Sequence, residues 1–279
     1  MRVLIIAILV CLAATPGSST LINHIGTYTN WTTSWTALPG LNDPVGARDE
    51  HDFVGDSSNP GAYWADNGTY VFFRFRVDVA AVTSTTFRDA HFVMINVAGY
   101  NYPAASGSNT NGVLPDVAFA WDSKSNDPLK HGLEMLILSR KDNTWNGINF
   151  NDLDTDAGQK AANDINGAGR TTDGYVRTDD GQATANFGTT TFIDYAISWN
   201  YLTNYTVLAR GQTWSIGLAS IANATDHNNL TSDIGGGADP TSATTVGWSA
   251  PINIPEPATD LLLVLGGGIT WVFSRRKRR

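Results

Sequence analysis

The chain has 279 residues, a formal net charge of −8 and 42% hydrophobic residues. Between residues 18 and 254, 12 Lys and Arg stand against 24 Asp and Glu, so this region carries a net charge of −12. Such an acidic body excludes nucleic-acid binding, which needs a basic face. Its length suits one all-β domain with a core of its own.

Residues 1–17 have the pattern of a secretory signal peptide. Arg2 provides the charged start, residues 3–14 are apolar, and small residues follow up to Gly17. The pattern predicts export through the general secretion machinery and removal by signal peptidase. Cys11 is the only cysteine of the chain. The mature body is therefore expected to hold no disulfide, although its export route permits them.

Residues 18–252 are predicted to form an antiparallel β-sandwich with jelly-roll or Ig-like layering. The stretch 70–78 (YVFFRFRVD) alternates apolar residues with a second set that includes two arginines, which is typical of a half-buried strand. Asn67-Gly68, just before it, is a tight-turn signal. Further strands are predicted at residues 91–97, 117–121, 133–139, 191–199, 214–221 and, with a lead-out, 240–251. Only residues 157–164 have the pattern of a short helix.

One loop carries a pattern that suits a divalent cation. Asp152, Asp154 and Asp156 stand at alternate positions, and a glycine follows at 158. Calcium takes several oxygen ligands from flexible carboxylates and carbonyls. The pattern makes calcium a candidate cofactor, although it departs from the EF-hand motif because glycine comes one residue late. A solvated acidic loop is the alternative interpretation.

Trp64 and Trp145 are the candidate sugar-binding residues, because turn residues flank both and a tryptophan ring can stack on a sugar. A place in the core is the alternative for each. The stretch 194–202 (DYAISWNYL) resembles a strand of family 9 carbohydrate-binding modules and DOMON-like domains, with Ser198 where those have proline. This resemblance implies a sandwich and, as a second hypothesis, calcium-supported glycan recognition. A third hypothesis is a glycan hydrolase using paired aspartates, although no pair stands out.

The C-terminal end divides into three parts. Residues 253–257 are predicted to be a stiff linker, because Pro255 and Pro257 fix their own φ and hold the preceding residues extended. Residues 258–274 are predicted to form a membrane-spanning helix of roughly 24 Å, shorter than the roughly 30 Å hydrocarbon core. This indicates a temporary anchor. The last five residues are basic and are expected to stay cytoplasmic: Arg275, Arg276, Lys277, Arg278 and Arg279.

The order of Pro255-Glu256-Pro257, an apolar segment and a basic end closely resembles the PEP-CTERM sorting signal of Gram-negative bacteria. Asp260 and the glycines at 266–268 depart from the usual apolar helix. The resemblance implies transient anchoring in the inner membrane and recognition by an exosortase, a membrane-embedded cysteine transpeptidase. It further implies a final place at the cell surface or in the extracellular matrix, with a link to exopolysaccharide and biofilm.

The leading hypothesis from these patterns is a non-enzymatic structural or adhesive protein of the bacterial surface. A plain C-terminal membrane tail without sorting is the alternative for the last residues.

Overall fold

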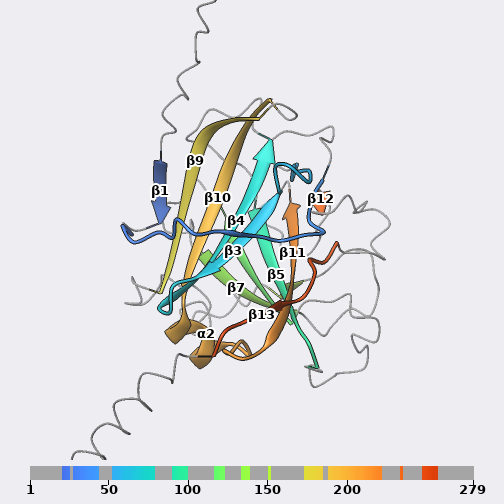
Figure 1. Cartoon of the computed structure of the whole chain (residues 1–279). Helices are drawn as coiled ribbons and strands as arrows, with labels where there is room; N and C mark the ends of the chain where they lie inside the picture. Colours follow the sequence, from blue (N-terminus) through green and yellow to red (C-terminus); the bar gives the residue numbers. More distant parts are fainter. Residues whose placement is uncertain are drawn as a thin grey trace, which may run out of the picture.

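A computed structural model of the chain describes residues 21–25, 28–43, 52–78, 90–99, 116–122, 133–138, 150–151, 173–184, 188–221, 233–234 and 247–256. Within this part of the chain, strands dominate and form two antiparallel sheets (Figure 1). No helix in these ranges is long and apolar enough to cross a membrane. The predicted signal peptide, membrane-spanning segment, basic cluster and short helix at 157–164 lie outside the described residues.

The two sheets are built from strands far apart in the sequence. Sheet A has the order β1 (Leu21–Ile25), β9 (Gly174–Thr184), β10 (Gly188–Ser198), β4 (Tyr70–Asp78), β3 (Ala62–Asp66), β2 (Thr36–Ala37). Sheet B has the order β12 (Asp233–Ile234), β11 (Thr213–Ile221), β5 (Ala90–Val97), β6 (Val117–Asp122), β7 (Leu133–Leu138), β8 (Phe150–Asn151), and β13 (Ile252–Asn253) pairs with β11. Every described pairing is antiparallel.

The two sheets face each other across one core. The predicted strand 70–78 is confirmed with the same bounds as β4, and the apolar set that it turns inward is almost fully buried: Val71, Phe73, Phe75 and Val77. These residues belong to the same cluster as Val93 of β5 and Ile216 of β11. Tyr195 also links the layers, because its hydroxyl donates a 2.7 Å hydrogen bond to the carbonyl of His91. This two-layer arrangement is consistent with a β-sandwich.

The outer face of β4 differs from the prediction of a half-buried strand. Phe72 is fully buried there, and Arg76 is only 5% exposed. Phe72 has a cover: residues 28–43, drawn in blue, run across the outside of sheet A (Figure 1). Tyr28, Trp31 and Trp35 from this segment pack against the Phe72 cluster. The Arg76 guanidinium instead lies 4.2 Å from the ring centroid of Phe192 on β10. Sheet A therefore buries both of its faces at this point.

A short helix, α2 (Trp199–Tyr205), follows β10. The sequence pattern predicts a strand up to residue 199, and this prediction is wrong at its end because β10 stops at Ser198. The Ser198 hydroxyl accepts a 3.0 Å hydrogen bond from the Tyr201 amide and so caps the helix. The same hydroxyl donates to a carboxylate oxygen of Asp173 at 2.6 Å. Ser198 thus marks the start of this helix.

Candidate functional site

The residue just before the Pro-Glu-Pro motif is fixed to the body. Ile254 is 2% exposed and belongs to the core between the sheets. Its amide donates to the carbonyl of Gln212 at 2.9 Å, and its carbonyl accepts from the amide of Gly211 at 3.0 Å. Asn253, in β13, pairs with Thr213 of β11. Asn253 and Ile254, which we predicted to begin a linker, therefore belong to the folded part of the chain.

The motif itself begins at the surface. Pro255 and Glu256 are both exposed. The Glu256 side chain lies against Gly211, which has a φ of +79°, in the left-handed region that favours glycine. A Cβ at residue 211 would collide with the Glu256 carboxylate, since it would lie 2.8 Å from the Glu256 Cδ. The absence of a side chain at Gly211 thus leaves the space that Glu256 occupies.

The turn at residues 209–212, here called the docking turn, is held in place by Gln212. The Gln212 Oε1 accepts from the Ala209 amide at 2.8 Å and from the Trp214 indole at 2.9 Å. Its Nε2 donates to the carbonyl of Val207 at 2.9 Å. One amide side chain therefore satisfies polar groups on both sides of the turn.

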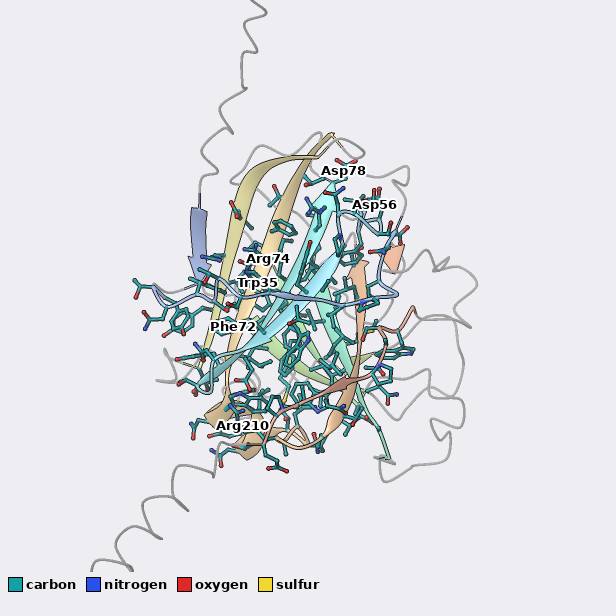
Figure 2. All side chains as sticks on the ribbon, in the orientation of Figure 1. Trp35, Asp56, Phe72, Arg74, Asp78 and Arg210 are labelled. Atoms are coloured by element: carbon teal, nitrogen blue, oxygen red, sulfur yellow. The ribbon has the colours of Figure 1, made fainter. Side chains whose placement is uncertain are left out.

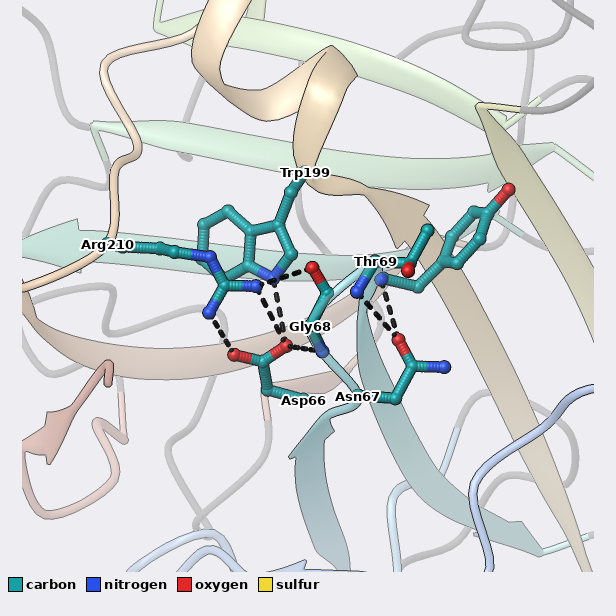
Figure 3. Close-up of polar contacts among 7 residues, drawn as sticks. Asp66, Asn67, Gly68, Thr69, Trp199 and Arg210 are labelled. Atoms are coloured by element: carbon teal, nitrogen blue, oxygen red, sulfur yellow. Dashed lines mark hydrogen bonds and ion pairs between the residues drawn. The ribbon is translucent and has the colours of Figure 1, made fainter. Parts of the chain in front are cut away.

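A second network ties the docking turn to the β3–β4 hairpin (Figure 3). Arg210 donates to both carboxylate oxygens of Asp66, at 2.7 and 3.2 Å, and to the carbonyl of Gly68 at 2.9 Å. Its guanidinium lies 4.2 Å from the ring centroid of Trp199, and the Trp199 indole donates to Asp66 at 2.9 Å. Burial alone would raise the pKa of Asp66, but the hydrogen bonds from Arg210, Trp199 and the Gly68 amide lower it overall.

The other cluster of charge lies on the outer face of sheet A. Asp194 of β10 is fully buried and accepts two hydrogen bonds of 2.7 Å from Arg74 of β4 and one of 2.8 Å from Arg177 of β9. The Arg74 guanidinium lies 4.4 Å from the Trp35 ring centroid, and that of Arg177 lies 4.3 Å from the Trp31 ring centroid. Figure 2 shows Trp35 of the covering segment close to Arg74 and Phe72 of β4.

These contacts give the Asp194 cluster a structural rather than a chemical character. Its carboxylate accepts three charge-assisted hydrogen bonds, and each arginine packs on a tryptophan ring. Arg74 has a second aromatic neighbour, Phe192, at 4.5 Å. The arrangement fixes the covering segment to the sheet through cation–π contacts.

Of the residues predicted to bind ligands, only Trp64 is described. It lies in β3, is half-buried and packs against the inner core cluster. Its indole Nε1 is buried and has no hydrogen-bond partner within the described residues. Trp145 and the proposed calcium ligands Asp152, Asp154 and Asp156 lie outside the described residues, so calcium and glycan binding stay predictions.

The described ranges contain no group of three or more His, Cys, Asp or Glu side chains that is arranged to hold a metal ion. Pro257 and the basic cluster 275–279 also lie outside the described residues.

The sequence patterns missed both the docking of Ile254 and the Asp194 cluster. The available signals were weak: an apolar residue at each alternate position of Ile252-Asn253-Ile254, and a single charge inside the otherwise uncharged stretch 189–197.

Comparison of the chain with protein-family models, curated proteins and solved structures found no match.

Proposed function

We propose that this chain is an exported bacterial surface protein that is anchored briefly by its C-terminal segment and then processed by an exosortase at Pro255-Glu256-Pro257. The observation that carries the proposal is the order of the motif, the apolar segment 258–274 and the basic residues 275–279. One structural observation supports it: among the described residues, Ile254 is the last one in the core, and Pro255 and Glu256 are exposed directly after it.

The body would serve as a structural or adhesive module, linked to exopolysaccharide, without catalytic activity. For its fold we propose jelly-roll or Ig-like layering. Consecutive described strands cross between the sheets in three places, from β4 to β5, from β8 to β9 and from β10 to β11.

The intact mass of the native protein, recovered from the producing cells and their medium, tests the sorting proposal. We expect a body that lacks everything after the Pro255 region. Replacing Pro255, Glu256 and Pro257 by alanine should leave the tail attached. Pro251→Ala is the matched control, because Pro251 is an exposed proline outside the motif. A wild-type mass that still includes Arg279 would leave an ordinary membrane-tethered protein and end the proposal.

Glycan binding is a second candidate function of the body. It is favoured by the half-buried aromatic side chains that gather on the outer face of sheet A: Tyr28, Trp31, Trp35 and Tyr70. Aromatic faces of this kind can stack on sugar rings. Pull-down on the polysaccharide of the producing cells, with the Trp31→Ala and Trp35→Ala variants compared with wild type, tests this function. Equal retention of all three proteins would contradict it.

A further inference from the structure

The main chain next to the motif is already hydrogen-bonded to the folded body. Both polar groups of Ile254 are hydrogen-bonded to the docking turn, and its side chain is buried in the core. Asn253 is held as well, because its Oδ1 accepts a 2.8 Å hydrogen bond from the Thr213 hydroxyl. On the motif side, the Glu256 carboxylate rests on Gly211. The segment 252–256 thus lies along the body instead of projecting from it.

An enzyme that reads an extended segment needs that segment free. Extended peptides are commonly bound through their main-chain hydrogen bonds and through pockets for alternate side chains. At Ile254 the docking turn already makes those hydrogen bonds, and the core already holds the side chain. A processing enzyme therefore cannot bind Ile254, or reach between Glu256 and Gly211, while β13 is paired.

The short stretch of chain between Ile254 and the predicted membrane-spanning segment also restricts access to the motif. The predicted apolar segment starts at residue 258, four positions after Ile254, and an extended chain spans at most about 14 Å over that interval. Release of residues 252–254 would add roughly 10 Å more. A membrane-embedded active site would thus meet the motif pressed against the folded body unless β13 detaches.

We infer that β13 and Ile254 gate the processing of this protein: they must leave β11 and the docking turn before the enzyme can bind the Pro-Glu-Pro motif. The inference rests on the proposed function, because it concerns access to that same motif. It assigns Ile254, Thr213 and Gly211 as positioning residues, which act by holding the motif and not by contact with the reacting bond.

A reversible cross-link across the β11–β13 pair tests the gate. Thr213 and Asn253 stand directly opposite each other in the antiparallel register, at a spacing that suits a disulfide. The double variant Thr213→Cys/Asn253→Cys is made in a Cys11→Ser background, so that the two new thiols are the only ones in the chain. Membranes holding the full-length protein are incubated with and without reductant, and the loss of the tail is followed by mass.

With the pair oxidised, we expect processing at least about tenfold slower than in wild type, and reductant should restore the wild-type rate. The reduced double variant serves as its own folding control, and wild type with and without reductant controls for effects on the enzyme. A second variant, Thr213→Ala, removes the hydrogen bond to Asn253 and should be processed about two- to tenfold faster. Processing of the oxidised pair at the wild-type rate would overturn the inference.

The alanine variant of the motif separates this inference from the proposed function. If the motif variant keeps its tail while the oxidised pair is processed normally, sorting stands and only the gate fails. If the motif variant is processed like wild type, the proposed function fails and the gate fails with it.

Discussion

Removal of the Asp194 carboxylate should be among the most damaging single changes in this body. The side chain is fully buried and accepts three charge-assisted hydrogen bonds, while the side chains of Arg74 and Arg177 are only 13% and 10% exposed. Asp194→Ala would leave two guanidinium groups nearly buried, next to each other and without this counter-ion. Breaking a buried pair by removing one partner costs about 3–5 kcal/mol.

Equilibrium unfolding in denaturant, followed by tryptophan fluorescence, measures this loss for Asp194→Ala and Asp194→Asn. For a body of this size, about 3–5 kcal/mol corresponds to a melting temperature lower by roughly 6–20 °C. The matched control replaces the whole network by apolar residues, as Asp194→Leu with Arg74→Met and Arg177→Met. It should recover most of the stability, because no buried guanidinium is left without the Asp194 carboxylate. A loss below about 1 kcal/mol in Asp194→Ala would refute the reasoning.

Three further changes probe other parts of the body. Burial raises the pKa of Asp116 to about 6, so the folded state holds a proton that the unfolded state releases above pH 4, and stability should fall as pH rises from about 4 to 6. Asp116→Asn should therefore raise the free energy of unfolding, measured in denaturant, by up to about 3 kcal/mol at pH 8 and by almost nothing at pH 4. An equal gain at both pH values would contradict this. Gly55→Ala should lower the unfolding free energy by about 1–3 kcal/mol or more in the same assay, because its Cβ would lie 2.5 Å from the Gly61 Cα. Arg210→Ala should lower the free energy of unfolding by about 1.5–3 kcal/mol. It should also raise the pKa of Asp66, which an NMR titration of the carboxylate would detect. An unchanged Asp66 titration would argue against the network.

The inner side of the fold was the predictable part. Strand β4 follows from its own alternation, because burial on one face of a strand requires apolar residues at every second position. The outer face could not be read in the same way. Its burial depends on residues 28–43, which lie far from β4 in sequence and follow no strand or helix period. Tertiary contact decided that face, and local pattern did not.

The charged cluster was hidden for a related reason. Arg74 and Asp194 are 120 residues apart, and only the register of β4 against β10 brings them opposite each other. The sequence shows that each charge lies in a predicted strand, but it does not show which residue of another strand stands opposite it. The docking of Ile254 was missed because β13 has only two residues, and two prolines follow closely. So short an alternation is weak evidence for a strand when the two prolines indicate a linker.

The free energies at β13 suit a gate that opens without unfolding of the body. Burial of the Ile254 side chain contributes about 2–3 kcal/mol, and the two backbone hydrogen bonds contribute about 1 kcal/mol each. Ordering the backbone of residues 252–254 opposes this by about 1–2 kcal/mol per residue. With the Thr213–Asn253 hydrogen bond and the packing of Ile252 added, the docked state is favoured by only a few kcal/mol. The segment should therefore detach far more often than the body unfolds, which takes about 5–15 kcal/mol.

Hydrogen exchange of individual amides can check this difference. The amides of Ile254 and Gly211 are bonded only through the docked segment, to Gln212 and to Ile254, so they should exchange with little protection, within about one to two orders of magnitude of a free peptide. Amides of β10, paired on both sides by β9 and β4, should exchange only with global unfolding. Thr213→Ala should speed exchange at Ile254 and leave β10 unchanged. Protection at Ile254 equal to that of β10 would mean that the segment detaches only when the whole body unfolds, and β13 would then be a permanent part of the core.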